Sequence, residues 1–165
     1  MQRIIIMGCP GSGKTYVAKE LGEKLDISVI YLDKLWRGKE GSHITKAEFD
    51  ARMEKALSLD SWIMDGDFSR TMEMRLKKCD TIVYLNLPRW LCLWNLFRRA
   101  RAGGIDPGGE KLTKEKVQYV WNYRKNNRIR NDIWIAKTKH ARVVELRSNK
   151  QVQAFLEECG TGDRG

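Results

Sequence analysis

The sequence predicts a three-layer α/β fold, in which a doubly wound, five-stranded parallel sheet has helices on both faces. Short apolar segments alternate with amphipathic segments along the chain, which is the pattern of parallel strands joined by helical crossovers. The first apolar segment leads through a glycine-rich turn directly into a helical segment, as in a βα unit. A length of 165 residues suits one compact domain, and no repeat or linker divides it. We therefore expect a single domain over residues 1–165.

The predicted strands are five short apolar segments. Residues 3–7 form a β-branched run of the kind that is buried on both faces of a parallel sheet. Ligands of open α/β sheets bind outside the carboxyl ends of the strands, so the residues that follow each segment are candidates for a site. The other segments predicted to be strands are residues 28–32, 61–64, 81–87 and 142–146.

The predicted helices have caps or apolar residues at helical spacing. Residues 14–24 carry apolar side chains every three or four positions. Thr45 and Glu48 match a capping box and open a helix that reaches Leu57. The last helix is expected over residues 150–158.

A glycine-rich loop separates two further predicted helices. Pro88 suits the first turn of one helix, and Thr113 caps a long helix that reaches about residue 139. Between them, residues 102–110 contain four glycines and one proline and are predicted to be a loop. The helix after Pro88 is expected to have an apolar face made of Trp90, Leu91, Leu93, Trp94 and Phe97.

The charge of the chain is concentrated in one segment. The formal net charge is +10, but residues 1–85 contribute only +1, whereas residues 98–142 contribute +9. Such a segment favours an anionic partner, which is a nucleic acid, an acidic membrane surface or the phosphates of a small ligand. No apolar run approaches the roughly 20 residues of a spanning helix, and the apolar start of the chain is too short for a signal peptide. We expect a cytoplasmic protein with no membrane partner.

The cysteines do not form a metal-binding pattern. None of Cys9, Cys79, Cys92 and Cys159 is part of a C-x-x-C pair, and both histidines are distant in the sequence, so a zinc site is not expected. In a cytosolic setting we expect reduced thiols. Cys92 is predicted to be in the core, and Cys9 is either an accessible, oxidisable thiol or a small packing residue.

Residues 8–15, GCPGSGKT, match the pattern G-x-x-x-x-G-K-[ST] completely. The glycines allow backbone amides to approach phosphate oxygens, and the following helix presents its positive end to the same anion. Lys14 can reach the β- and γ-phosphates, and the Thr15 hydroxyl can ligate Mg²⁺. The residues expected to form the cradle are Gly8, Pro10, Gly11, Ser12, Gly13, Lys14 and Thr15. ATP and Mg²⁺ are the expected cofactors, the alternative being a glycine-rich turn without a ligand.

Several segments resemble known P-loop kinases. The opening RIIIMGCPGSGKTYVAKELGEKL resembles the adenylate kinase and shikimate kinase branch, and WIMDGDFSRT at 62–71 is similar to the D-G-F-P-R-T segment of adenylate kinases with one extra residue. YLDKLW at 31–36, DGDFS at 65–69, YLNLP at 84–88 and LCL at 91–93 resemble the small adenylate-kinase-like proteins named "DNA topology modulation protein". This resemblance spans about residues 2–157. It implies a nucleotide-kinase fold with a short lid at about 101–125, and the family name implies an effect on DNA.

Polar residues at two strand ends are candidates for the metal and the acceptor. Asp65 ends the third predicted strand and either ligates Mg²⁺ or caps the next helix. Gly66, the next residue, allows a substrate to approach the backbone. Asp33 ends the second predicted strand and either orients the acceptor hydroxyl or is a turn residue. Trp36 either lines the acceptor pocket or packs in the core.

The arginines around the predicted lid have two interpretations. Cations near a helix C-terminus are favourable in any case, but Arg98 and Arg101 are i, i+3 neighbours that can converge on one target. In adenylate-kinase-like proteins, arginines that flank the lid bind the transferring phosphoryl group. The resemblance therefore implies catalytic roles for Arg98 and Arg128, and nucleotide contacts for Arg101 and Arg124.

Three more arginines are candidates for anion contacts, with solvated surface positions as the alternative. Arg70 corresponds to the arginine of the D-G-F-P-R-T segment, and Arg75 is a second candidate in the same helix for contacts with the acceptor. Arg147 corresponds to the loop that packs adenine in related kinases. One departure concerns Asn86, which ends the fourth strand where the family usually has Asp. The lid contains no cysteine, so a zinc-braced lid is excluded.

Two functions follow from these features. The leading one is an ATP-dependent kinase that phosphorylates a small-molecule acceptor, whose identity the sequence does not provide, in a monomer or a homodimer. The alternative is a nucleic-acid-binding P-loop ATPase or regulator, with Tyr119, Trp121 and Tyr123 interleaved with basic residues as the binding surface.

Overall fold

The computed structural model describes residues 1–38, 42–102 and 112–161, and within them a single five-stranded sheet. All neighbouring strands are parallel, and their order is β2-β3-β1-β4-β5. The predicted fold class is confirmed. The strands are β1 (Arg3–Gly8), β2 (Val29–Tyr31), β3 (Trp62–Asp65), β4 (Thr81–Leu85) and β5 (Arg142–Leu146).

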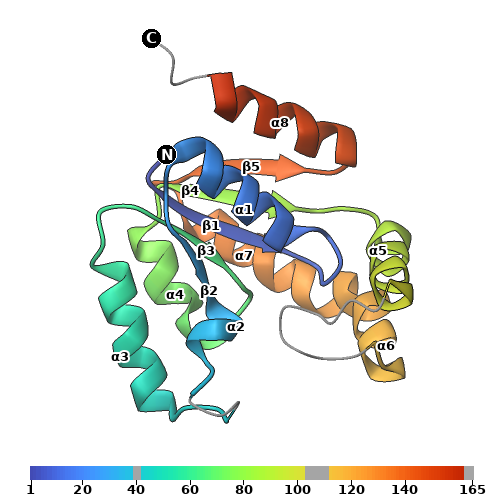
Figure 1. The fold of residues 1–165 in the computed structure, drawn as a ribbon, viewed down its shortest axis with the longest axis horizontal. Coiled ribbons are helices and arrows are strands. Elements are labelled where there is room, and N and C mark those ends of the chain that lie inside the picture. The colour runs from blue at the N-terminus through green and yellow to red at the C-terminus, as the bar shows by residue number, and fades with distance from the viewer. Residues whose placement is uncertain (39–41, 103–111, 162–165) are drawn as a thin grey trace.

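Helices cover both faces of this sheet (Figure 1). Strand side chains alternate between the faces, so Ile4 and Ile6 of β1 pack with α1 and α8, whereas Ile5 and Met7 pack with α3, α4 and α7. Both faces of β1 are therefore apolar, as its sequence requires. The helical segments are α1 (Lys14–Leu25), α2 (Leu32–Leu35), α3 (Lys46–Leu57), α4 (Ser69–Lys78), α5 (Arg89–Arg101), α6 (Lys114–Tyr123), the π-helical η2 (Arg124–Arg128), α7 (Ile129–Lys137) and α8 (Asn149–Thr161).

The predicted caps and boundaries agree with the structure, with three differences. The Glu48 amide donates to Thr45 Oγ1 over 3.2 Å, and the Lys116 amide donates to Thr113 Oγ1 over 3.3 Å, so both caps are present. The long helix after Thr113 includes the π-helical segment η2, and the short helix α2 was not predicted. Strand β4 ends at Leu85, two residues before the predicted end: the Asn86 amide still donates to Leu146 O of β5, but the chain then turns into Pro88, which has no amide hydrogen for the sheet.

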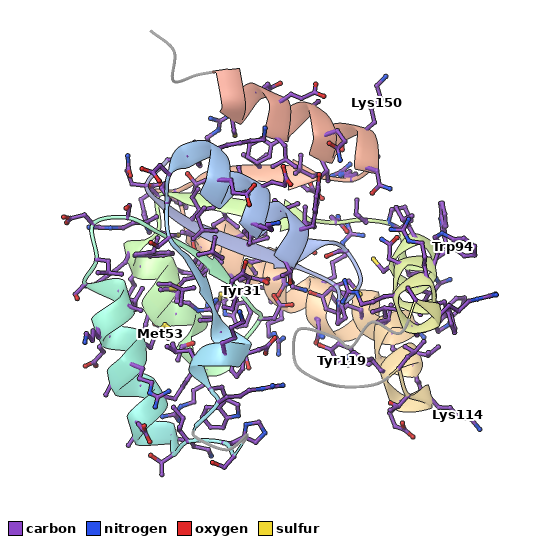
Figure 2. All side chains as sticks on the ribbon, viewed as in Figure 1. Tyr31, Met53, Trp94, Lys114, Tyr119 and Lys150 are labelled. Atoms are coloured by element: carbon purple, nitrogen blue, oxygen red, sulfur yellow. The ribbon has the colours of Figure 1, made fainter. Side chains whose placement is uncertain are left out.

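The predicted apolar face of α5 is correct only in part. Leu91 and Leu93 are partly buried and pack with the buried Cys92 and Leu96 in the core beside the 8–15 loop, whereas Trp90, Trp94 and Phe97 are exposed. Figure 2 shows Trp94 on the outer side of α5. None of the described helices is long and apolar enough to cross a membrane.

Candidate functional site

The loop between β1 and α1 forms an open cradle at the carboxyl edge of the sheet. Gly11 and Gly13 have φ angles of 80° and 90°, which favour glycine. A Cβ atom on Gly13 would meet no atom within 4 Å, so the backbone here is accessible to a ligand. Ser12 Oγ is buried and has no hydrogen-bond partner among the described residues. These features fit a phosphate group, with the start of α1 behind it.

Lys14 lies folded over this loop. Its Nζ donates to Gly8 O over 2.6 Å and to Cys9 O over 3.2 Å, and it lies 3.4 Å from Asp67 Oδ2. Burial by itself lowers the pKa of Lys14, but the carboxylates of Asp67 and Asp65 outweigh it and leave the pKa above its ordinary value. The site therefore contains a permanently charged ammonium group, with Asp67 as its counterion.

Thr15 and Asp65 form the candidate metal site. Thr15 Oγ1 donates to Asp65 Oδ2 over 2.7 Å, and Asp65 is aligned with Ile6 across the β1–β3 pair, which brings this carboxylate to the loop. Burial raises the pKa of Asp65, and Lys14 and the Thr15 hydroxyl oppose the increase. A hydroxyl and a carboxylate fit Mg²⁺, which commonly binds to one or two protein oxygens and completes its shell with water and phosphate. The described residues include no cluster of three or more His, Cys, Asp or Glu side chains arranged to hold a metal ion.

A cavity of about 610 Å³ opens in front of these groups. Asp33 lines it as predicted, as does Gly66. Trp36 is not among the described lining residues, because its ring packs edge-on against Phe49 with the centroids 5.2 Å apart. The packing interpretation of Trp36 is therefore the correct one. The lining residues from the loop, α5 and the α6 segment are Pro10, Gly11, Gly13, Lys14, Thr15, Arg99, Thr113, Glu115, Lys116 and Tyr119, and those beyond β2 and β3 are Asp33, Asp65, Gly66 and Asp67.

A second cavity of about 640 Å³ lies on the other side of the same loop. Gly11, Gly13 and Arg99 line both cavities, so the two meet at the cradle. Arg147 was predicted to contact adenine here, but its guanidinium is bound to Glu145 over 2.8 Å. The residues that line this cavity are Gly11, Ser12, Gly13, Tyr16, Val17, Asn95, Arg98, Arg99, Ala102, Asn149, Val152 and Gln153.

The arginines around the predicted lid lie in different places. Arg98 lines the second cavity. Arg128 lines neither of these two cavities: its Nε lies 3.6 Å from Asp132 Oδ2, and it lines a separate small cavity with Tyr84. Arg101 is exposed at the end of α5 and lines neither cavity. The side chain of Arg124 and lid residues 103–111 lie outside the described part of the chain.

Arg99 is the functional candidate that the sequence analysis missed. It lies seven residues after Cys92 and three after Leu96, on the helix face that packs against the loop, and it lines both cavities. This helical spacing from the buried residues is the signal that could have identified it. Lys116 and Tyr119 of α6 were also missed, and Figure 2 shows Tyr119 on the side of α6 that faces the rest of the molecule.

Arg70 and Arg75 line neither of the two cavities. Arg75 is completely buried, and its guanidinium donates to Gly66 O over 2.9 Å and to Phe68 O over 2.7 Å. Burial lowers its pKa to about 10. Arg75 thus supports the turn after β3 from within and is not available to an acceptor anion. Arg70 is exposed and forms an ion pair with Asp50.

This sheet order, with a glycine-rich loop leading into α1, defines the fold of a P-loop kinase. The chain is similar to the shikimate kinase of Acinetobacter baumannii in complex with shikimate, at 19% identity and a TM-score of 0.61, over 100% of this chain and 96% of that chain. It is also similar to the shikimate kinase of Bacteroides thetaiotaomicron, at 18% identity and a TM-score of 0.57, over 95% of each chain. No protein-family model matches the sequence, and no curated protein matches it. The likeness shows the fold that the P-loop kinases have, and it does not extend to the proteins named "DNA topology modulation protein".

Proposed function

We propose that this chain transfers the γ-phosphoryl group of Mg·ATP to a small acceptor molecule. The observation that carries the proposal is that Lys14, Thr15 and Asp65 meet in one cavity that continues to Asp33. The loop alone would account for nucleotide binding, as in any P-loop protein. The space beyond Asp65 accommodates a second molecule, and a volume of about 610 Å³ is typical of small-molecule sites.

The position of each residue suggests its role. Lys14 exchanges the Asp67 carboxylate for phosphate oxygens when a nucleotide binds, so that its charge remains compensated. Thr15 and Asp65 would hold Mg²⁺, which when bound neutralises charge on the phosphoryl group. Asp33 orients the acceptor hydroxyl at the far end of the cavity. Positioning and charge do most of the catalysis in phosphoryl transfer, so no stronger base is needed.

Basic residues on the opposite side of the cavity stabilise the donor phosphates. Arg99 and Lys116 line the cavity from α5 and α6, and Arg98 lines the nucleotide side of the loop. Guanidinium groups suit the charge that spreads over the phosphoryl oxygens during transfer. Closure of a lid at about 101–125 would exclude water and favour transfer over hydrolysis.

The test is ADP release from Mg·ATP across a panel of hydroxylated acceptors. We expect ADP release that depends on one acceptor class, falls by about 100-fold or more in Lys14→Ala, and persists at moderate salt. Lys19→Ala is the matched control, because Lys19 is an exposed lysine of α1 that pairs with Glu23 and lines neither cavity among the described residues. ADP release that is independent of both Lys14 and an acceptor would contradict the proposal.

A second candidate function, the binding of single-stranded nucleic acid, is favoured by one observation. Trp90, Trp94 and Phe97 are exposed on α5, and Arg89 stacks on the ring of Trp121 at 3.9 Å from its centroid. Exposed aromatic rings beside arginines can stack with bases. The surface expected from the sequence is different, because Tyr123 is buried and Tyr119 lines the cavity in front of Lys14.

The binding of a labelled single strand, measured by fluorescence anisotropy at several salt concentrations, distinguishes the two functions. Nucleic-acid binding predicts a steep salt dependence and a loss of affinity in Trp94→Ser, with or without ATP. If Trp94→Ser does not change Mg·ATP turnover and the protein binds no single-stranded nucleic acid at low salt, the kinase is the function that remains.

A further inference from the structure

We propose that Tyr119 is a phosphate-contacting residue, whose hydroxyl donates a hydrogen bond to the terminal phosphoryl group of the donor nucleotide. This role rests on the proposed phosphotransferase function and adds a neutral donor to the cations of the site. Three features of the molecule point to it: the place of Tyr119 in the cavity in front of Lys14, the hydrogen bond that its hydroxyl accepts from Asn127, and the π-helical segment η2 between these two residues.

Tyr119 is accessible to a ligand in this cavity. It belongs to α6, and 47% of its surface is exposed, so it has room for a further contact. Figure 2 shows it on the side of the helix that faces the rest of the molecule. Burial raises the pKa of Tyr119, Asp67 raises it further and Lys14 lowers it, so the hydroxyl lies within electrostatic range of the ion pair between Lys14 and Asp67.

The two cavities indicate which part of the nucleotide Tyr119 can contact. Gly11, Gly13 and Arg99 line both cavities, whereas Lys14 and Tyr119 line only the one in front of the cradle. The lysine of a glycine-rich loop of this type reaches the β- and γ-phosphates. A nucleotide whose nucleoside occupies the second cavity therefore extends its distal phosphates, and not its base, toward Tyr119.

The Tyr119 hydroxyl has a hydrogen to offer to such a phosphate. A phenol oxygen can accept one hydrogen bond while its own hydrogen is donated in another. Asn127 Nδ2 donates to this oxygen, and the hydroxyl donates to no other described residue. Asn127 is buried, so it occupies the accepting side of the oxygen from within the protein. The hydrogen is left for the open cavity, where a phosphate oxygen would form a charge-assisted bond.

The π-helical segment η2 brings Asn127 to Tyr119. Tyr119 with Asn127 and Tyr123 with Asn131 form two pairs that each span eight residues, and both pairs cross η2. In a regular α-helix the eighth residue lies about 80° around the axis from the first. A π-helical turn contains about one residue more, so it returns the eighth residue toward the line of the first. Such turns occur frequently at functional sites.

The second pair supports the first from inside the protein. Tyr123 and Asn131 are buried, and Asn131 Nδ2 donates to the Tyr123 hydroxyl over 2.9 Å. The rings of Tyr119 and Tyr123 pack edge to face with their centroids 6.0 Å apart. The same pair of chemical groups thus occurs once in the core and once at the cavity, which provides a matched control.

The test compares the affinities of Mg·ADP and Mg·AMPPNP, a non-hydrolysable analogue of Mg·ATP, by calorimetry. Tyr119→Phe keeps the ring and removes only the hydroxyl. We expect the affinity for Mg·AMPPNP to fall by about tenfold or more and that for Mg·ADP to stay within about twofold, because only the analogue carries a terminal phosphoryl group. A ratio of the two affinities that stays the same, or changes in the opposite direction, would overturn the assignment.

Tyr123→Phe is the control, because it removes the same hydroxyl from the buried pair. It should lower the unfolding temperature and leave the ratio of the two affinities unchanged. If it shifts the ratio as much as Tyr119→Phe does, helix packing and not a phosphate contact is the explanation.

Asn127→Ala tests whether Asn127 acts as a positioning residue. We expect it to lower the preference for Mg·AMPPNP over Mg·ADP by less than Tyr119→Phe does. The double variant should show no larger loss than Tyr119→Phe alone, because Asn127 acts through the hydroxyl that is then absent. Additive losses would contradict this positioning role.

Failure of the role of Tyr119 is distinguishable from failure of the proposed function. If neither nucleotide binds, or if Lys14→Ala leaves both affinities unchanged, the phosphotransferase is wrong and the role of Tyr119 falls with it. If both nucleotides bind through Lys14 and Tyr119→Phe leaves the ratio of their affinities unchanged, the phosphotransferase stands and only the role of Tyr119 is wrong.

Discussion

The contact between Lys14 and Asp67 sets the charge balance of the phosphate cradle. The ammonium group lies folded over the loop and is mostly shielded from solvent, and Asp67 Oδ2 lies 3.4 Å away and compensates its charge before any nucleotide arrives. A buried charge without a partner is costly. A nucleotide phosphate must therefore replace Asp67 at Lys14, so the carboxylate stabilises the empty protein and competes with the ligand.

Asp67→Asn should separate these two effects. Without nucleotide, we expect the variant to unfold at a lower temperature, with a loss of about 1–2 kcal/mol in the free energy of unfolding, because Lys14 loses its charged partner. The increase in unfolding temperature caused by saturating Mg·ADP should become larger, because the phosphate then supplies the missing charge. Thermal unfolding with and without nucleotide measures both.

Asp50→Asn is the control for this prediction, since its carboxylate pairs with the exposed Arg70 far from the loop. It should change neither the stability without nucleotide nor the response to Mg·ADP appreciably. If Asp67→Asn weakens the stabilisation by Mg·ADP, competition at Lys14 is the wrong explanation.

Arg75 and Arg70 lie on the same helix but differ in their contribution to stability. Arg75→Met should lower the unfolding free energy by about 2 kcal/mol or more, because Gly66 O and Phe68 O lose their donors inside the protein. Arg70→Met should change it little, because its partner is exposed to solvent. Urea denaturation of the two variants tests this, and equal effects would contradict the structural role of Arg75.

At the scale of elements, the packing of the 8–15 loop against α5 determines the shape of the site. A Cβ on Gly11 would lie 2.3 Å from Cys92 O, and Asn95 Nδ2 donates to Gly11 O over 2.9 Å. On this helix Arg98 and Arg99 reach the cavities. The loop and α5 therefore act as one unit, in which the glycine allows close backbone contact and the helix supplies the cations.

Gly11→Ala and Gly13→Ala should have different consequences. Both place a side chain at positive φ, which costs about 1–2 kcal/mol. Gly11→Ala also forces α5 away from the loop, so we expect a clearly larger loss of stability. The Cβ of Gly13→Ala would meet no atom of the described residues within 4 Å, and this substitution should instead reduce nucleotide affinity by about tenfold or more, because the Cβ enters the phosphate space. Chemical denaturation and a nucleotide titration distinguish them, and equal stability would contradict this packing.

The sequence predicts elements better than it predicts the orientation of their side chains. Thr45 and Thr113 were identified as caps because capping depends on local spacing. Asp65 was placed beside the loop because neighbouring parallel strands end at the same edge of the sheet. Trp90, Trp94 and Phe97 were expected on the apolar face of α5 but are exposed, and Arg128 lies beside Asp132, because helix rotation depends on tertiary packing that periodicity does not fix.

At the scale of the whole molecule, Asp80 connects three strands of the sheet. Its carboxylate accepts the amides of Gln2 and Arg3 over 2.7 and 2.9 Å and the Thr81 hydroxyl over 2.6 Å, and its carbonyl accepts the Arg142 amide. Burial by itself raises the pKa of Asp80, but these hydrogen bonds outweigh it and leave the pKa below its ordinary value. The ionised carboxylate therefore contributes to the stability of the whole sheet.

Asp80→Asn should make this contribution visible through its dependence on pH. Because the folded-state pKa is lowered, the stabilisation is present above the unfolded-state pKa of about 4 and is lost as pH falls through the folded-state value. We expect the variant to be less stable by about 1 kcal/mol at pH 7, a modest figure because the carboxylate is largely solvated. The difference should narrow below pH 4, and urea denaturation at several pH values measures it. A difference that is constant with pH would contradict the charged role.

The net charge of +10 is one property that the structure helps to explain. The cations of the basic segment include Arg98, Arg99 and Lys116 at the two cavities, which suits a nucleotide triphosphate. Others, such as Arg101 and Arg128, lie elsewhere. Composition revealed the excess charge, but only the fold shows which of these residues reach the phosphate cradle.

The buried cysteines provide built-in chemical reporters of local opening. Cys159 lies in the core on the α1 and α8 side, Cys79 in the core on the opposite face, and Cys9 and Cys92 in the core between the loop and α5. All four are free and buried. A thiol-alkylating reagent can reach each one only when its own core opens, so peptide-resolved labelling rates would report three regions of one unmodified protein separately. If nucleotide slows the labelling of Cys9 and Cys92, the ligand stabilises the packing between the loop and α5, and no engineered probe is needed to show it.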